Sequence, residues 1–381
     1  MSKVIAGLGS AFLVLCSVFA ATFQGESCQY CIWEPNLHVE LNPDSSVIRG
    51  IFGSSQFTTN KIGLRGDDLK DQEIRMITIG GSTMECGYLD DKETWPYLLQ
   101  EKLAAKTQKS AWVGNAGRSG MNSRHHILQM EKLFDQIKNI DLAIILIGVN
   151  DAGLLVDNYN PAGLDDPKLR KQSMDASFRV LPADDIASWI KASIRSLRRM
   201  LLGDTAFMIN KATQTGIQYK GARERRKRAR KVAIPQQKLE LLPAVLDEYK
   251  RNIESMIRLC NRYRVRPLFL TQPSLYQLSL PPEDEALLWG GVVDHNEKDE
   301  NAWLYATVAE LKRIMGEYNR VLLETARAND ALVLDLDAVV SPSWDVFYDD
   351  VHFTEKGARI VADAVAEFVC RQGVFPCEVS S

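Results

Sequence analysis

Five short apolar runs recur along the chain and predict buried β-strands. They are residues 75–81, 111–117, 142–148, 266–272 and 331–337. The third run, LAIILIG, is apolar throughout, as is typical of parallel strands that are covered on both faces. Segments with helical periodicity lie between the runs, namely residues 95–106, 188–201, 245–264 and 303–328.

Strands that alternate with helices form a parallel sheet with helices on both of its faces. We therefore predict an α/β fold, a three-layer α/β/α sandwich around a five-stranded parallel sheet. Residues 25–70 contain scattered Pro and Gly and no long periodic segment, so they are interpreted as an extended lead-in. The predicted domain spans residues 71–372, with a less regular insertion around 152–235, and residues 373–381 form a C-terminal tail.

The N-terminal region differs from the rest of the chain. Residues 4–23 hold no charged side chain, so residues 1–24 are predicted to be a secretory signal peptide or an N-terminal membrane anchor. A buried core helix is the third interpretation. Lys3 before the run and Glu26 after it favour a chain body outside the cytoplasm. We therefore expect an exported domain, either periplasmic or secreted, or attached to a membrane through residues 4–23.

The charge of the chain argues against a nucleic-acid partner, because the formal net charge is -3 at pH 7. One basic run, residues 220–231, holds eight basic side chains and one acid, Glu224. Few aromatic residues accompany it and the chain is expected to be exported. Both features favour a solvated loop or helix face over a nucleic-acid patch. Contact with an anionic polymer or a lipid headgroup is the remaining alternative.

Four of the cysteines lie near the two ends of the domain: Cys28, Cys31, Cys370 and Cys377. They are compatible with disulfides in an oxidising compartment. A zinc site built from the same four and a set of inert thiols are the alternatives, and the connectivity stays open. No other group of residues has the spacing of metal ligands, so we expect no metal and no cofactor.

Residues that can carry chemistry follow four of the predicted strands. They are Ser82 in GGSTMECG, Gly120 in NAGRSGMNS, Asn150 in GVND, and Asp349 and His352 in DDVH. In an open parallel sheet, ligands bind beyond the carboxyl ends of the strands. We therefore expect these residues to converge on one edge of the sheet.

Their chemistry is that of acyl transfer. A serine hydroxyl is a weak nucleophile and needs an adjacent base, which His352 can supply while Asp349 orients the imidazole. The backbone N–H groups of Ser82 and Gly120 and the side-chain amide of Asn150 can stabilise an oxyanion. Each segment alone is also compatible with a turn, a phosphate-binding loop or a helix cap. Their order and their places after the strands favour the catalytic interpretation.

The four segments resemble the sequence blocks of the SGNH, or GDSL-like, hydrolase superfamily. TIGGST, NAGRSG, GVND and DDVH match its first, second, third and fifth blocks, and the resemblance runs from about residue 75 to about residue 371. Gly81 stands where the family usually has aspartate, while the serine is kept.

The resemblance implies a flavodoxin-like fold with Ser82 as the nucleophile. Gly120 and Asn150 would complete the oxyanion hole, and Asp349 and His352 the triad. Asp349 is preferred to Asp350 because the acid of the family lies three residues before the histidine.

Other candidates for the site are weaker. His125 and His126 begin a predicted helix and are interpreted as surface or capping residues. Tyr276 and Trp289, in a long loop, are candidates for stacking on a sugar ring or for lining an acyl pocket. Packing of that loop is the alternative.

We therefore expect a serine hydrolase that cleaves carboxylic esters outside the cytoplasm. By family analogy, O-acetyl groups on carbohydrate are the candidate substrate, and an acylated lipid is the alternative. An O-acetyltransferase that modifies an exported polysaccharide with the same triad is a second hypothesis. A catalytically silent module that binds ligands in the cleft is a third, which the intact triad disfavours.

Overall fold

The computed structural model describes residues 29–153, 159–181, 219–277, 279–294 and 303–378. At its centre lies a five-stranded parallel sheet with the strand order β10-β7-β5-β3-β4. The strands are β3 (Ile74–Gly80), β4 (Ala111–Asn115), β5 (Leu142–Leu146), β7 (Arg266–Leu270) and β10 (Leu332–Leu334). Each falls within one of the five predicted runs or one residue from it, so the predicted sheet is confirmed.

The strand order explains where a site can form. Numbered along the chain, the strands of the sheet run 2-1-3-4-5, which is the flavodoxin-like order. The direction of winding changes between β3 and β5, and at the carboxyl end of this pair Gly80 lies opposite Leu146. A ligand site is expected at this point, because the connections after the two strands diverge to opposite faces of the sheet.

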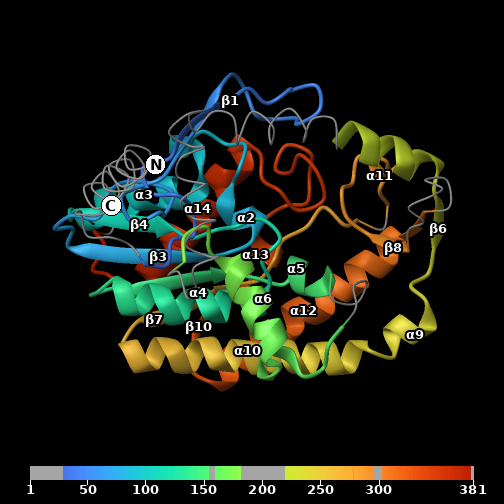
Figure 1. Cartoon of the computed structure of the whole chain (residues 1–381). Coiled ribbons are helices and arrows are strands. Elements are labelled where there is room, and N and C mark those ends of the chain that lie inside the picture. Colours follow the sequence, from blue (N-terminus) through green and yellow to red (C-terminus); the bar gives the residue numbers. More distant parts are fainter. Residues whose placement is uncertain (1–28, 154–158, 182–218, 278, 295–302, 379–381) are drawn as a thin grey trace, which may run out of the picture.

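Helices cover both faces of the sheet (Figure 1). On one face, α3 (Trp95–Thr107) packs against α14 (Glu355–Arg371). On the other, α10 (Leu242–Tyr263) packs against both α4 (Ser123–Gln136) and α12 (Val308–Ala328). With both faces covered, a wholly apolar strand such as β5 is buried along its length.

One predicted helix is shorter in the structure than its pattern suggested. The helix expected over residues 303–328 begins only at Val308, because Leu304–Ala306 form the short strand β9. Thr307 starts the helix instead, since its hydroxyl accepts a hydrogen bond from the backbone N–H of Glu310 at 3.3 Å. The helix predicted over residues 188–201 lies outside the described residues.

The polar segment before the first strand is more than a lead-in. Within it, β1 (His38–Leu41) pairs antiparallel with β2 (Ser55–Thr58), and Trp33 and Phe57 are buried in the core with ring centroids 5.2 Å apart. The pattern did not predict this packing, because the apolar positions are scattered and the strands are only four residues long.

A buried arginine at the end of this segment fixes the loop beside the site. Arg65 is 2% exposed, and its Nε lies 2.7 Å from Oδ1 of Asp91. Its two terminal nitrogens donate to the carbonyl oxygens of Gln56, Glu85, Cys86 and Leu89. All five guanidinium N–H groups are thereby used, and residues 85–91 are held against the core.

A second, three-stranded sheet was not predicted. It has the order β6-β9-β8, with β6 (Arg230–Val232) parallel to β9 and β8 (Val292–Asp294) antiparallel to it. Strands of three residues carry too few positions for a periodic signal.

The basic run leads into this sheet as a helix over residues 219–228 followed by β6. One face of that helix is buried, with Tyr219, Arg223 and Arg226 at 4%, 9% and 0% exposure. Lys220 and Lys227, on the other side, are exposed. The predicted solvated face is therefore correct for only part of the run. The buried arginines stack on aromatic rings, Arg223 on Tyr219 and Arg226 on Tyr305.

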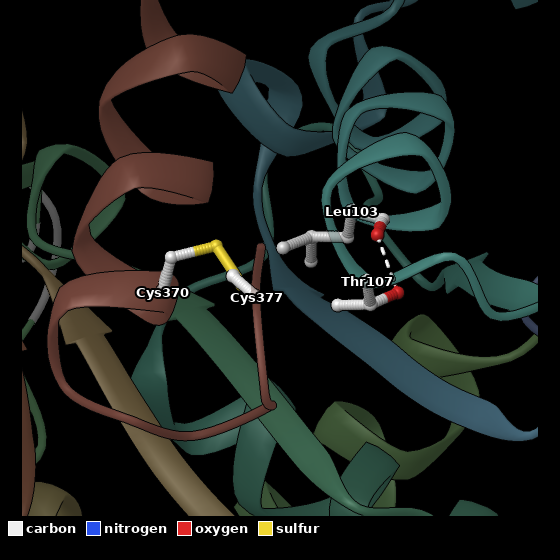
Figure 2. The surroundings of a disulfide bond; sticks show 4 residues. All are labelled: Leu103, Thr107, Cys370 and Cys377. Atoms are coloured by element: carbon white, nitrogen blue, oxygen red, sulfur yellow. Dashed lines mark hydrogen bonds between the residues drawn. A yellow bond between two sulfur atoms is a disulfide. The ribbon is translucent and has the colours of Figure 1, made fainter. Parts of the chain in front are cut away.

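The C-terminal tail is tied to the domain. Cys370, near the end of α14, forms a disulfide with Cys377, and Figure 2 shows the bond beside Leu103 and Thr107 of α3. The predicted zinc alternative is thus wrong, because two of its four thiolates are used in this bond. Cys31 is buried, and Cys28 lies outside the described residues.

In the part of the chain that the structure describes, no helix is both long and apolar enough to cross a bilayer. The uncharged run of residues 4–23 lies outside that part.

Candidate active site

Ser82 stands on a tight turn directly after β3. It begins the short helix α2 (Ser82–Glu85) and is preceded by two glycines. A Cβ atom at Gly80 would lie 2.6 Å from the carbonyl oxygen of Leu146, and one at Gly81 would lie 2.2 Å from Nδ2 of Asn150. Any side chain at position 81 would displace Asn150. Glycine at the position where the family usually has aspartate therefore lets the Asn150 amide lie against the turn that carries the serine.

A continuous hydrogen-bonded chain joins Ser82 to an acid 267 positions further along. Oγ of Ser82 lies 2.7 Å from Nε2 of His352, and Nδ1 of His352 lies 2.7 Å from Oδ2 of Asp349. The other oxygen, Oδ1, accepts the backbone N–H groups of Val351 and His352 at 2.9 and 2.8 Å. The predicted contact between the serine and the histidine is thus present, and the arrangement suits proton transfer from the hydroxyl to the imidazole.

The charges of His352 and Asp349 shift the pKa values of both groups in the direction that favours this proton transfer. Burial alone would lower the pKa of His352, but the charge and the hydrogen bond of Asp349 outweigh it and raise that pKa above 6.5. Burial works to raise the pKa of Asp349. The charge and hydrogen bond of His352, with further donated hydrogen bonds, lower it on balance. Asp349 therefore stays a carboxylate beside an imidazole that is a stronger base than usual.

The neighbouring acid Asp350 has a different setting. Its Oδ1 accepts the N–H of Trp289 at 3.0 Å, and its Oδ2 accepts the N–H of Gly290 at 3.0 Å and the hydroxyl of Tyr276 at 2.7 Å. Burial, and then the charge of Asp349, raise the pKa of Asp350. Of the two adjacent acids, Asp349 is the one that contacts the imidazole, as the spacing of three residues predicted.

Of the two other predicted oxyanion donors, Asn150 lies against the serine turn. Gly120 has a φ of +79°, a conformation that glycine adopts without strain, and open space surrounds its α-carbon. The Nδ2 of Asn150, on α5 (Val149–Ala152), donates to the carbonyl oxygen of Met121 at 2.8 Å. An amide carries two N–H groups, so this bond leaves one for a substrate oxygen.

A small cavity opens beside Ser82 and His352. Its other lining residues are Thr83, Cys86, Tyr88, Leu89, Tyr348 and Phe353, and its volume is about 10 Å³. The ring of Tyr348 is stacked on the imidazole, with centroids 5.4 Å apart and planes 7° apart. Burial raises the pKa of the Cys86 thiol to about 12. The walls are therefore aromatic or uncharged, and the space is that of one water-sized group.

Tyr276 and Trp289, the two weaker candidates in the long loop, lie in different environments. Tyr276 is buried and its hydroxyl is bonded to Asp350, so it packs the loop and does not offer a face to a sugar. Trp289 is 36% exposed, and its inner side packs on Tyr219 with ring centroids 4.4 Å apart. Trp289 is thus the one of the two that has a ring accessible to a ligand.

The two adjacent histidines belong to the start of α4. His125 completes a capping box, with its Nδ1 accepting the backbone N–H of Asn122 at 3.2 Å. His126 is 1% exposed and its Nδ1 lies 2.8 Å from Oε1 of Gln129. The prediction of a capping role holds for His125, but the surface location is wrong for His126. Burial lowers the pKa of His126 to about 4.

Tyr219 is a contact of the triad that sequence reasoning missed. Its hydroxyl donates to Oδ2 of Asp349 at 2.7 Å, across 130 positions of sequence. The available signal was the spacing of Tyr219, Arg223 and Arg226, which lie at i, i+4 and i+7 on one helix face. The high charge of the run hid this periodicity.

Among the described residues, no group of three or more His, Cys, Asp or Glu side chains is arranged to hold a metal ion. The groups that meet at the end of β3 are a serine, a histidine and an aspartate, with the amide of Asn150 beside the serine turn. Such an arrangement on a flavodoxin-like sheet is chemically suited to acyl transfer.

Comparison with known proteins agrees with this class. Residues 218–365 match the model of the GDSL-like Lipase/Acylhydrolase family. That match includes Asp349 and His352, and Ser82, Gly120 and Asn150 precede it. This part of the chain is therefore similar to the GDSL-like lipase/acylhydrolase family, the resemblance that the sequence blocks predicted. No curated protein matches the sequence.

Several solved structures are similar at low identity. A mutant of an acetyl-xylooligosaccharide esterase from Geobacillus Stearmophilus is 16% identical, with 78% of this chain and 94% of that chain covered and a TM-score of 0.40. An acetyl xylan esterase is 15% identical, with 78% and 100% covered and a TM-score of 0.40. A member of the lipolytic protein G-D-S-L family from Veillonella parvula DSM 2008 is 10% identical, with 77% and 97% covered and a TM-score of 0.39.

Proposed function

We propose that this chain is a serine carboxylesterase that works through an acyl-enzyme on Ser82. The Oγ of Ser82 attacks the ester carbonyl while His352 accepts its proton and then gives that proton to the departing alcohol. Water, deprotonated by His352, next attacks the acyl-enzyme and releases the acid. The observation that carries this proposal is the unbroken hydrogen-bonded chain from Ser82 through His352 to Asp349.

The tetrahedral intermediate of this reaction needs donors for its oxyanion. We assign this role to the backbone N–H groups of Ser82 and Gly120 and to the side-chain amide of Asn150. The support is the contact between the Gly81 position and Nδ2 of Asn150, together with the open surroundings of Gly120.

Replacing Asn150 by alanine or aspartate should lower kcat by about a hundredfold or more, since one oxyanion donor contributes roughly 3 kcal/mol to the transition state. Steady-state kinetics on an activated ester measure this, and thermal unfolding checks that the protein remains folded. Asn150→Asp is the closer match in shape, because it removes the donor and keeps the size. If both variants keep the parent kcat, Asn150 serves only to hold the carbonyl of Met121.

The cavity beside Ser82 supports a short acyl group such as acetyl. Its small volume of about 10 Å³ and its wall of Tyr88, Leu89, Tyr348 and Phe353 favour a small acyl group over a long chain. Trp289 binds Asp350, the neighbour of the triad acid, through its backbone N–H, and its ring is partly exposed. Exposed tryptophan faces suit sugar rings. These two features favour O-acetyl groups on carbohydrate as the substrate class.

Acetate esters should be cleaved with a kcat/KM about tenfold or more above that of octanoate esters, because a single misfitting methylene already costs roughly that factor in an apolar pocket. A series of p-nitrophenyl esters measures the preference. Leu89→Ala, which widens the cavity, should move the optimum to longer chains. An octanoate optimum in the parent protein would contradict the short-acyl assignment.

The same series, run with and without a sugar acceptor, separates hydrolysis from O-acetyl transfer. A hydrolase releases acetate at the same rate in both, whereas a transferase forms an acetylated sugar and releases less acetate. Esterolysis without transfer is the result that the proposal predicts. Absence of both reactions would favour the silent binding module.

We also propose that the domain is exported. The uncharged run of residues 4–23 and the disulfide between Cys370 and Cys377 support this, because disulfides persist in oxidising compartments. Mass spectrometry of the mature N-terminus distinguishes a cleaved signal peptide from a retained anchor. Full-length protein found soluble in the cytoplasm would contradict export.

A further inference from the structure

The buried carboxylate of Asp349 receives four hydrogen bonds, one of them from outside the DDVH segment. Three come from within that segment: the N–H groups of Val351 and His352 and the Nδ1 of His352. The fourth is the hydroxyl of Tyr219, which donates to the same oxygen that faces the imidazole, at 2.7 Å. Tyr219 thus touches the triad acid on the oxygen through which that acid acts.

The phenol is held in place on several sides. Its ring packs on Trp289 and contacts the ring of Tyr348, with centroid distances of 4.4 and 6.2 Å. The guanidinium of Arg223, one turn further along the helix, lies 5.6 Å from the centre of the same ring. One more turn along, Arg226 donates to the carbonyl of Gly290. Since Gly290 also binds Asp350, the helix over residues 219–228 is fastened to both acids of the DDVH segment.

A hydroxyl in this position has two physical effects on the triad. It fixes the rotation of the Asp349 carboxylate, so that Oδ2 stays directed at Nδ1 of His352. It also takes up part of the negative charge on Oδ2, because a donated hydrogen bond stabilises the ionised form of an acid. Both effects act on the imidazole through the carboxylate, and neither requires contact with the substrate.

We propose that Tyr219 is a positioning residue of the reaction, the fourth member of a chain that runs Ser82–His352–Asp349–Tyr219. This inference rests on the proposed function of the same site. Tyr219 lies directly before the basic run, on the same helix, and Arg223 of that run packs on its ring. The helix thereby holds the tyrosine at the triad.

The pH dependence of the reaction separates this role from a merely structural one. Without the hydroxyl, the charge on Asp349 is more concentrated and attracts the imidazolium form of His352 more strongly, so the pKa of His352 should rise. The inflection of kcat/KM should then move to higher pH. The other ionisable groups around the pair are unchanged in such a variant; they are Arg49, Glu85, Cys86, Tyr88, Arg223, Arg226, Tyr276, Tyr348 and Asp350.

Tyr219→Phe in the full chain is the test, with kcat, KM and the pH profile measured on p-nitrophenyl acetate. We expect kcat to fall about tenfold, the factor that a lost hydrogen bond to a charged group represents. KM should stay the same, and the inflection should move upward. Tyr276→Phe is the matched control, because it removes a hydroxyl at the same 2.7 Å from the adjacent buried carboxylate of Asp350. It should cost similar thermal stability and shift the inflection much less, because Asp350 acts on His352 only through its charge and makes no hydrogen bond to the imidazole.

A second control removes the same type of bond far from the triad. Tyr263, on α10, donates to Asp135 at 2.5 Å, and Tyr263→Phe should keep the parent kcat and pH profile. The inference is overturned if Tyr219→Phe behaves like Tyr263→Phe, or if Tyr276→Phe shifts the inflection equally. Ser82→Ala, assayed alongside, isolates the cause. If it is inactive, only the role of Tyr219 fails; if it stays active, the proposed function fails as well.

Discussion

Ser82→Ala is expected to lower kcat/KM for ester cleavage by about 10,000-fold or more, the effect of removing a triad nucleophile. The hydroxyl oxygen of Ser82 lies 2.7 Å from Nε2 of His352. It is the only atom of the serine side chain that can accept the acyl group, and alanine lacks it. A matched control is Ser119→Ala, an exposed serine that follows β4 on the same edge of the sheet. It should keep the parent rate. If the two variants are equally active, the nucleophile lies elsewhere.

Asp349→Asn is expected to lower kcat by about 10,000-fold, because an amide stabilises the wrong tautomer of the histidine. The Oδ2 that receives the proton-bearing Nδ1 would become either an amide oxygen of lower charge or an NH₂ group. His352 would then lose the contribution that raises its pKa. Steady-state kinetics with the purified variant measure the loss, and circular dichroism checks the fold.

The pH profile gives the same prediction an independent measure. Only the neutral imidazole can accept the serine proton, so the activity of the parent protein should rise with pH through one inflection above 6.5. Asp349→Asn removes the charge that raises this pKa, and the inflection should move down. Asp350→Asn should change neither the rate nor the inflection strongly, because Asp350 binds Trp289, Gly290 and Tyr276 and does not bond to the imidazole. The reverse behaviour of the two variants would identify Asp350 as the acid.

The sheet and the triad were predictable because their signals are local. An apolar run such as residues 142–146 can only be a strand buried on both faces or part of a buried helix, and its length and flanking glycine decide between them. The catalytic segments follow strands directly, so the topology of a parallel sheet brings them together. The order of the segments was enough to expect Ser82 and His352 at one edge of the sheet, and the family resemblance identified Asp349 as the acid.

The surroundings of the site were not predictable, because they depend on pairs that are distant in sequence. Arg65 is a single charged residue in a polar segment, and only its five tertiary partners show why it is buried. Tyr219 lies directly before, and Arg226 within, a run whose charge suggests solvent, and their contacts with Asp349 and Gly290 exist only in the folded chain. Helix and strand propensity and hydrophobic pattern each describe a single segment of the chain, whereas these contacts join two segments that are distant in sequence.

The most direct test of the central claim is to map the site of covalent labelling by a fluorophosphonate. We expect one adduct, on the peptide that contains Ser82, formed by the parent protein and lost in both Ser82→Ala and His352→Ala. The reagent mimics the tetrahedral intermediate and reacts only with a hydroxyl that a neighbouring base activates. An adduct on a different residue, or ester cleavage that persists in a protein that takes no label, would contradict the assignment of Ser82 as the nucleophile.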